Sequence, residues 1–206
     1  MIKVWGRNNS VNVQKATWCL EELKVPYERV DAGMQYGVVN TPEFRKMNPN
    51  GLVPVIEDAG TVLWESNAIV RYLAARHGAG TLWPGDLRLR ADADRWMEWQ
   101  STTFTPAMRD AFLQAVRVPA DKRDPAMLEA SRAATEKAAA ILDAHLAGRE
   151  FVAGDAFSPA DIVLGCAAHR WLHLPITREP RPQLERWYAA LGARPGARQV
   201  VETPVR

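Results

Sequence analysis

The sequence predicts an α/β part over residues 1–80, followed by an all-helical part over residues 87–206. Residues 1–80 hold 14 Val and Ile against seven Ala, whereas residues 81–206 hold ten Val and Ile against 24 Ala. β-Branched residues favour strands and Ala favours helices. Gly and Pro recur over residues 78–86 and predict a linker, because they stop one helix before the next begins. We therefore expect two domains.

The elements expected in the first part alternate between strands and helices. Apolar periodicity and turn residues predict strands over residues 2–5, 27–30, 54–57 and 61–64, and helices over residues 12–24, 42–47 and 66–77. Thr41 is the expected N-cap of the short helix, with Pro42 at its first position. A strand–helix–strand unit this short implies parallel pairing, and Asp58-Ala59-Gly60 is a hairpin signal. This βαβ-α-ββα order is a thioredoxin-like arrangement.

Amphipathic patterns predict helices in the second part. The residues expected on the buried face of one long helix are 127, 131, 134, 138, 141, 142 and 145 or 146. Ser158-Pro159-Ala160-Asp161 has the Ser-x-x-acid pattern of an N-terminal capping box. The apolar run 162–168 predicts that the helix after this box lies at the domain centre. Residues 182–191 predict a further helix, and the tail after Pro195 is expected to be irregular.

Composition excludes several classes of partner. The 26 Lys and Arg against 24 Asp and Glu leave a formal charge of +2, and no run of basic residues favours a nucleic acid. Cys19 and Cys166 lack the spacing of a zinc site or a disulfide scaffold, which fits a reducing compartment and predicts no metal. No apolar run reaches 18 residues, so no membrane partner is expected. The sequence predicts a cytoplasmic protein.

The loop over residues 6–12 is the first candidate for chemistry. It joins a strand to a helix N-terminus, where backbone N–H groups and the helix dipole favour an anion. Ser10 and Asn12 can each donate a hydrogen bond to a bound thiolate, which lowers the pKa of the thiol. The alternative interpretation is that one of these two side chains caps the helix.

Two other segments can hold a ligand. A cis bond between Val53 and Pro54 would turn the Val53 backbone outward, toward an extended peptide, whereas a trans bond would make an ordinary loop. Glu65 and Ser66 stand at a predicted helix start. Ser66 can cap that helix or receive a carboxylate, and Glu65 can pair with an α-ammonium group, so together they suit one end of a zwitterion.

Taken together, these segments resemble the glutathione transferases over essentially the whole chain. The residues that carry the resemblance are Asn50-Gly51-Leu52-Val53-Pro54-Val55, Trp64-Glu65-Ser66-Asn67-Ala68-Ile69 and Ser158-Pro159-Ala160-Asp161. The resemblance implies the glutathione transferase fold, a cis proline at Pro54 and glutathione as co-substrate without a metal. It implies that the Leu52 and Val53 backbone binds the cysteinyl part and that Glu65 and Ser66 hold the γ-glutamyl end. Many relatives have a basic residue where this chain has Leu52, and Asn50 is a candidate to replace its contact with the glycine carboxylate.

The loop also bears on the class within the family. The tyrosine classes place Tyr near the end of the first strand, where this chain has Trp5 and Gly6, and the loop lacks the Cys of other classes. The remaining patterns are the theta-type serine at Ser10 and the bacterial nu-like Ser10-Val11-Asn12 with Lys15 following. Either Ser10 or Asn12 can be the main thiolate donor in these patterns.

The resemblance implies a cytoplasmic homodimer that conjugates the glutathione thiolate to a small apolar electrophile, as in detoxification. Trp96, Trp99 and Thr103 recur on one predicted helix and can either bind that electrophile or serve in packing. Two alternatives remain open, namely a glutathione-dependent disulfide-bond reductase and a non-catalytic ligand-binding protein of the same fold.

Overall fold

All four strands come from the first part of the chain and form one mixed sheet. The computed structural model describes every residue from Met1 to Arg206. The strands are β1 (Ile2–Trp5), β2 (Tyr27–Val30), β3 (Val55–Asp58) and β4 (Thr61–Trp64), in the order β2-β1-β3-β4. β1 pairs with β2 in parallel, and β3 is antiparallel to both β1 and β4. The predicted parallel unit and the predicted hairpin are confirmed.

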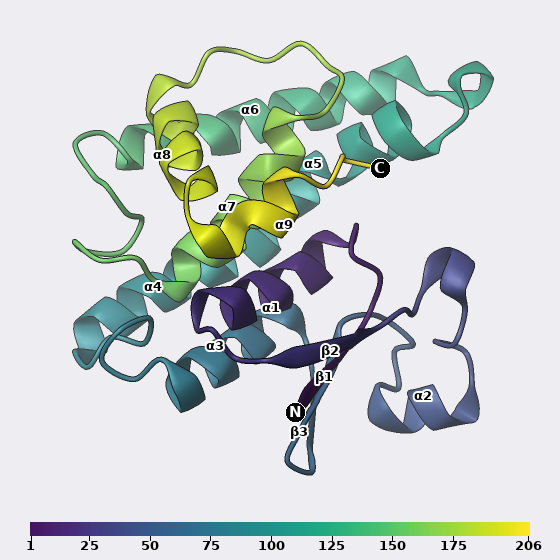
Figure 1. The fold of residues 1–206 in the computed structure, drawn as a ribbon. Coiled ribbons are helices and arrows are strands. Elements are labelled where there is room, and N and C mark those ends of the chain that lie inside the picture. Colours follow the sequence, from purple (N-terminus) through teal and green to yellow (C-terminus); the bar gives the residue numbers. More distant parts are fainter.

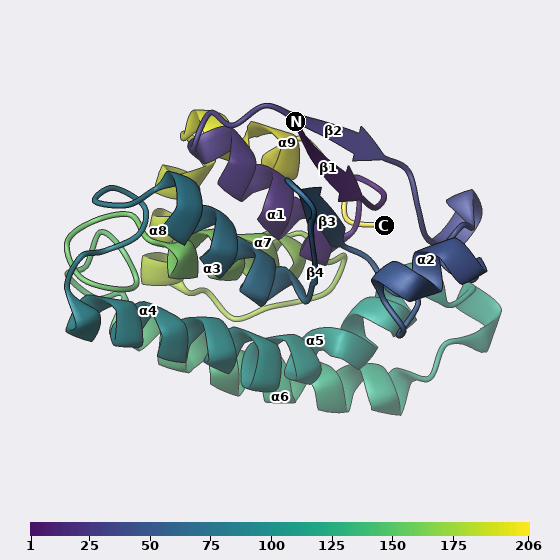
Figure 2. The ribbon, with the colours of Figure 1, turned by 90° about the horizontal axis from the view of Figure 1, so that it is seen from below.

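Three helices flank this sheet, which Figures 1 and 2 show from two sides. They are α1 (Val11–Glu22), α2 (Pro42–Met47) and α3 (Ser66–His77), with a 3-10 turn at Met34–Tyr36. α1 and α3 lie on one face, and α2 lies apart from them beyond the other side of the sheet. The Thr41 side chain accepts a hydrogen bond from the Phe44 N–H at 3.2 Å, which confirms the predicted cap. β3 begins one residue later than predicted, because Pro54 has no N–H to donate to the ladder.

The second part is helical, as predicted. Its elements are α4 (Leu87–Trp99), a π-helical segment (Gln100–Phe104), α5 (Thr105–Phe112), a second π-helical segment (Leu113–Arg117), a 3-10 turn (Ala120–Lys122), α6 (Pro125–His145), α7 (Pro159–Leu172), α8 (Pro182–Gly192), a 3-10 turn (Pro195–Ala197) and α9 (Arg198–Val201). α7 packs against α1, α4 and α8 and is buried on nearly every side, so its central position is confirmed. The capping box of Ser158 and Asp161 is present at its start.

Of two predictions for this part, one is partly wrong and the other is wrong. The residues of α6 that are buried are Ser131, Thr135, Glu136, Ala138, Ala139 and Leu142. The predicted buried face is confirmed at positions 131, 138, 142 and 146. It is wrong at Met127, Ala134 and Ile141, which are exposed, because α5 and α8 pack on a seam rotated by about one residue from the expected face. The tail after Pro195 is not irregular but forms a 3-10 turn and the single turn of α9, which pack onto α1.

One hydrophobic core runs through both parts and fixes their relative position. Trp18 of α1 is 1% exposed, and a β-carbon at Gly165 of α7 would lie 2.8 Å from its ring. The absence of that β-carbon lets α1 approach α7 closely. Cys19 and Cys166 are free and buried in the same core, where burial raises the pKa of both thiols. Both residues therefore serve in packing.

Candidate functional site

A polar pocket of about 380 Å³ lies where α1 and the start of α3 meet the first π-helical segment. Its lining residues are Asn12, Lys15, Glu65, Ser66, Asn67, Ala68, Arg71, Glu98, Gln100, Ser101 and Thr105. Three of the residues predicted from sequence, Asn12, Glu65 and Ser66, therefore share one cavity. The other four, Ser10, Asn50, Leu52 and Val53, lie outside its lining.

Ser10 is the residue at the N-cap position of α1, but its side chain does not cap the helix. Its backbone is extended, its side chain makes no capping hydrogen bond, and the residue is 6% exposed. The Ser10 N–H donates to the Arg7 carbonyl at 3.2 Å, and the Ser10 carbonyl accepts from Gln14 at 2.9 Å. The capping interpretation is therefore wrong for the Ser10 hydroxyl, which is left without a partner in the protein. Asn12, in the first turn, is exposed in the pocket.

Glu65 and Ser66 form the other end of the pocket. Glu65 has a positive φ of 69°, a conformation that is costly for a residue with a side chain and that is common at functional sites. It occupies the N-cap position of α3 without capping the helix with its carboxylate, which is exposed. Ser66 is the first helical residue, so its N–H is among the unpaired donors that favour a carboxylate. This end of the pocket can hold both charges of an amino-acid group.

Lys15 is a buried cation behind this end of the pocket. Its Nζ donates to Gln100 Oε1 at 2.8 Å, to Asn67 Oδ1 at 3.0 Å and to Ser66 Oγ at 3.4 Å. The residue is 2% exposed, and burial lowers its pKa to about 8. No role was predicted for Lys15 from the sequence. The available signal was its spacing of three residues from Asn12, which puts both side chains on one face of α1.

The loop before β3 carries the predicted cis bond between Val53 and Pro54. No group of the protein bonds to the Val53 N–H or C=O, so both are free for an extended peptide. Leu52 is 65% exposed, and its carbonyl accepts from the Asn48 side chain at 2.9 Å. Asn50 donates to Asn48 Oδ1 from both its backbone and its side chain, at 3.0 Å each.

Arg45 on α2 is a cation beside this loop, and it was not among the residues predicted from the sequence. Its guanidinium donates to the Pro49 carbonyl at 3.0 Å and lies 3.0 Å from the position of a β-carbon at Gly51. A positive charge therefore stands beside the loop although Leu52 is apolar. The contact is local, since Arg45 lies only four residues before Pro49, at the end of α2.

Trp96 and Trp99 face away from the polar pocket. The Trp96 ring centroid lies 4.3 Å from that of His145 on α6, and the Trp99 ring stacks on Phe104 at 5.5 Å. Both rings line a separate hollow of about 420 Å³ on the α6 side. Both rings therefore pack against neighbouring rings and also border this hollow, and Thr103 lines neither cavity.

The chain has neither a candidate metal-binding cluster nor a candidate membrane-spanning helix. No group of three or more His, Cys, Asp or Glu side chains is arranged to hold a metal ion. None of the helices combines the length and the apolar character that crossing a bilayer requires.

Comparison with known proteins covers the whole chain. Residues 1–75 match the glutathione S-transferase N-terminal domain family, and residues 102–195 match the glutathione S-transferase C-terminal domain family. The chain is 44% identical to glutathione S-transferase GstB of Escherichia coli over 207 residues, covering 100% of each. It is 31% identical to glutathione S-transferase 4 of Zea mays, covering 98% of this chain and 92% of the maize protein.

Solved structures agree with this assignment. The crystal structure of a theta class glutathione S-transferase from Xanthomonas axonopodis pv. citri, with glutathione bound, superimposes with a TM-score of 0.96 at 43% identity. That match covers 100% of this chain and 99% of the other. The thioredoxin-like and helical parts are thus those of one established fold, and the chain belongs to the glutathione S-transferase family.

Proposed function

We propose that this chain is a glutathione transferase that conjugates the glutathione thiolate to a small apolar electrophile. Residues 1–80 form its glutathione-binding domain and residues 87–206 contribute the electrophile site. The observation that carries the proposal is the pocket lined by Glu65 and Ser66. Glu65 supplies a carboxylate, and Ser66 supplies the N-terminus of α3 beside it. An amino-acid zwitterion is the ligand that such a pair suits, and the γ-glutamyl end of glutathione is one.

The cysteinyl and glycyl parts of glutathione fit the loop before β3. The free N–H and C=O of Val53 suit the backbone of the cysteinyl residue. The glycine carboxylate then reaches the loop over residues 50–52, where Arg45 supplies the positive charge that Leu52 does not. The Asn50 side chain, held by Asn48, contributes a polar group there.

Ser10 and Asn12 are the proposed catalytic residues. The unpaired Ser10 hydroxyl and the exposed Asn12 amide stand at the start of α1, where donors and the helix dipole favour a thiolate. A thiol of pKa about 8.5 is only a few per cent ionised at neutral pH, and lowering the pKa by about 2 units makes the thiolate dominant. The thiol proton leaves to solvent, and the sulfur then forms a bond to the electrophilic carbon as the leaving group departs with its electron pair.

We also propose that the chain is a cytoplasmic homodimer with a role in detoxification. Val62 and Trp64 on β4, Leu87 at the start of α4 and Ile141 on α6 are large apolar residues at the surface, which a second copy can cover. Sedimentation is expected to give twice the 23.0 kDa of one chain. A species of one chain at micromolar concentration would contradict the dimer.

The catalytic assignment is tested with the double variant Ser10→Ala, Asn12→Ala. We expect the rate of conjugation of 1-chloro-2,4-dinitrobenzene to fall at least a hundredfold, since two donors to the thiolate are lost. Asn8→Ala, an exposed change in the same loop, is the matched control and should keep full activity. Full turnover in the double variant would contradict the assignment. If the protein reduces a glutathione mixed disulfide but conjugates no electrophile, its function is disulfide reduction and the proposed conjugation is wrong.

A further inference from the structure

Three arginines from distant segments meet beside the loop that carries Ser10. Arg7 follows β1, Arg117 ends the second π-helical segment, and Arg170 lies near the end of α7. The Cζ atoms of Arg170 and Arg117 lie 4.2 Å and 5.5 Å from the centroid of the Phe112 ring. All three side chains are half-buried. We call these three residues the arginine cluster.

No Asp or Glu side chain pairs with the arginine cluster, whereas Arg71 and Arg181 at other helix contacts each pair with acidic side chains. Arg117 donates to the backbone oxygen of Arg206 at 2.5 Å. Arg7 Nε is buried without a hydrogen-bond partner. Donors of this kind are costly to bury unless a ligand satisfies them.

The charges also act on one another. Burial lowers the pKa of Arg170 to about 10, and the neighbouring Arg117 and Arg7 lower it further in the same direction. Burial, followed by the charge of Arg117, lowers the pKa of Arg7. A half-buried group of like charges attracts anions from solution. The arrangement therefore favours a negatively charged occupant.

The position of the arginine cluster relates it to the proposed sulfur site. The Arg7 carbonyl accepts the Ser10 N–H at 3.2 Å, so both residues belong to one tight turn. The Arg7 guanidinium extends toward Gly33, whose β-carbon position lies 3.3 Å from Arg7 and 3.5 Å from the Val53 side chain. Arg7 thus lies on the Val53 side of the loop, and none of the three arginines lines the pocket assigned to the γ-glutamyl end.

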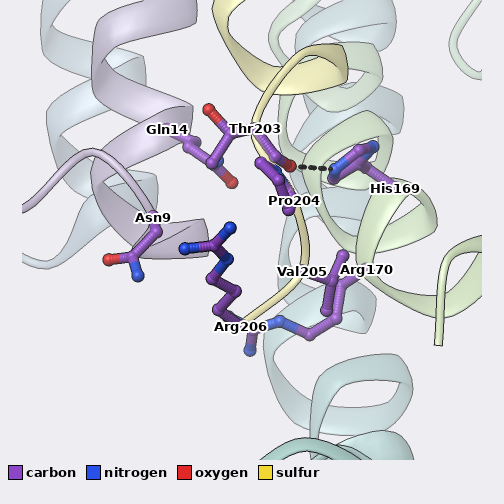
Figure 3. A pocket seen from close by; sticks show the side chains of 8 residues that line it. All are labelled: Asn9, Gln14, His169, Arg170, Thr203, Pro204, Val205 and Arg206. Carbon is purple, nitrogen blue, oxygen red and sulfur yellow. Dashed lines mark hydrogen bonds between the residues drawn. The ribbon is translucent and has the colours of Figure 1, made fainter. Parts of the chain in front are cut away.

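Figure 3 shows the side of the cluster nearest the end of the chain. Arg170 extends toward the base of Arg206, and Thr203–Arg206 lies against Asn9 and Gln14 at the start of α1. His169 holds this segment by its contact with the Thr203 carbonyl at 3.0 Å. Basic side chains from the second part of the chain therefore reach the loop of Ser10.

We infer that the arginine cluster binds a carboxylate carried by the electrophile, so that the preferred second substrate is an apolar molecule with an acidic substituent. The inference rests on the proposed function and narrows its substrate class. The planar guanidinium forms two parallel hydrogen bonds with a carboxylate, which fixes the orientation of the electrophile as well as its affinity. The carboxylate takes no part in the bond changes.

The test compares two electrophiles that differ in one charge, 4-(chloromethyl)benzoate and its methyl ester. In both, the glutathione sulfur forms the new bond to the benzylic carbon and chloride leaves with its electron pair. We expect wild-type kcat/KM to favour the acid at least tenfold after correction for the uncatalysed rates. In Arg170→Met and in Arg7→Met, kcat/KM for the acid should fall at least tenfold, with the ester within about twofold of wild type. The control is Arg198→Met, since Arg198 is 79% exposed and pairs only with Glu202.

Direct binding separates this inference from the proposed function. Calorimetric titration of the unreactive 4-methylbenzoate into protein saturated with S-methylglutathione should show binding in wild type and at least tenfold weaker binding in Arg170→Met. Equal kcat/KM for acid and ester in wild type, or no binding of 4-methylbenzoate, would overturn the inference even if conjugation occurs. An increased glutathione Kd in both variants, with acid and ester affected alike, would also overturn it, because the cluster would then hold a carboxylate of glutathione. Binding of 4-methylbenzoate without any conjugation would contradict the proposed function alone.

Discussion

Lys15 Nζ and Gln100 Oε1 lie 2.8 Å apart and join α1 to the first π-helical segment across the polar pocket. The same ammonium donates to Asn67 and Ser66 at the start of α3. One buried cation therefore links the three elements that form the pocket. π-Helical turns are frequent at functional sites, and here the turn belongs to the segment that brings Gln100 to Lys15.

Replacing Lys15 by Met should weaken glutathione binding. The ammonium lies behind Ser66, where the γ-glutamyl carboxylate is proposed to bind, and its charge favours that anion. We expect the KM for glutathione to rise about tenfold, which corresponds to about 1.4 kcal/mol, with kcat at saturation changed much less. Lys137→Met, an exposed change on α6, is the control. An unchanged KM with a lower kcat would contradict this role.

The buried Lys15 should also make stability depend on pH in the alkaline range. Its pKa is about 8 in the folded chain against 10.5 for an ordinary lysine, so the unfolded chain holds one more proton between these values. Stability rises with pH wherever the unfolded state binds more protons. Relative to Lys15→Met, the wild-type free energy of unfolding should rise from pH 8 to about 10.5, by at most about 1.4 kcal/mol per pH unit, and stay level below pH 8. Urea unfolding of both proteins measures this difference, and a flat difference would show that burial does not lower the pKa of Lys15.

Asp161 should be the most sensitive residue of the capping box. Its carboxylate accepts from the Val152 N–H and Trp187 Nε1 at one oxygen, and from the Ser158 N–H and Oγ at the other, all at 2.9–3.0 Å. Asp161→Asn turns an amide N–H₂ toward two of these donors, and we expect a loss of about 2–4 kcal/mol in urea unfolding. Asp155→Asn in the exposed neighbouring loop should change stability by less than about 0.5 kcal/mol.

Gly165→Ala should destabilise the chain, although Ala is more favourable than Gly inside a helix by about 1 kcal/mol. The new β-carbon would lie 2.8 Å from two atoms of the Trp18 ring, inside the contact of α1 with α7. Overpacking of this kind costs about 1–3 kcal/mol, so we expect a net loss of stability. The control is Gly85→Ala, where a β-carbon meets nothing within 4 Å. A stability gain for Gly165→Ala would mean that the two parts of the chain can shift apart at little cost.

The sequence predicted the order and type of the elements because local signals determine them. The Thr41 cap, the hairpin at Asp58–Gly60 and the Ser158 capping box each depend on residues within a few positions of one another. The resemblance implied that Val53, Glu65 and Ser66 bind glutathione, and the structure brings Glu65 and Ser66 into one pocket with Asn12.

The sequence could not predict which face of a helix is buried or where a side chain points, because both depend on the elements that pack against that helix. The buried seam of α6 follows α5 and α8, and the direction of Trp96 follows α6. The arginine cluster is the clearest example, since its members are far apart in the chain and no basic run marks them. Only folding places two of them, Arg117 and Arg170, over one aromatic ring.

The most direct test of the central claim, that the loop of Ser10 and Asn12 activates glutathione, is an ultraviolet difference titration. The protein is titrated with glutathione across pH, with S-methylglutathione as the blank, and the thiolate band reports the pKa of the bound thiol. We expect that pKa near 6.5, about 2 units below the free value, and a return toward about 8.5 in the Ser10→Ala, Asn12→Ala variant. A pKa near 8.5 for glutathione bound to the wild-type protein would contradict the claim.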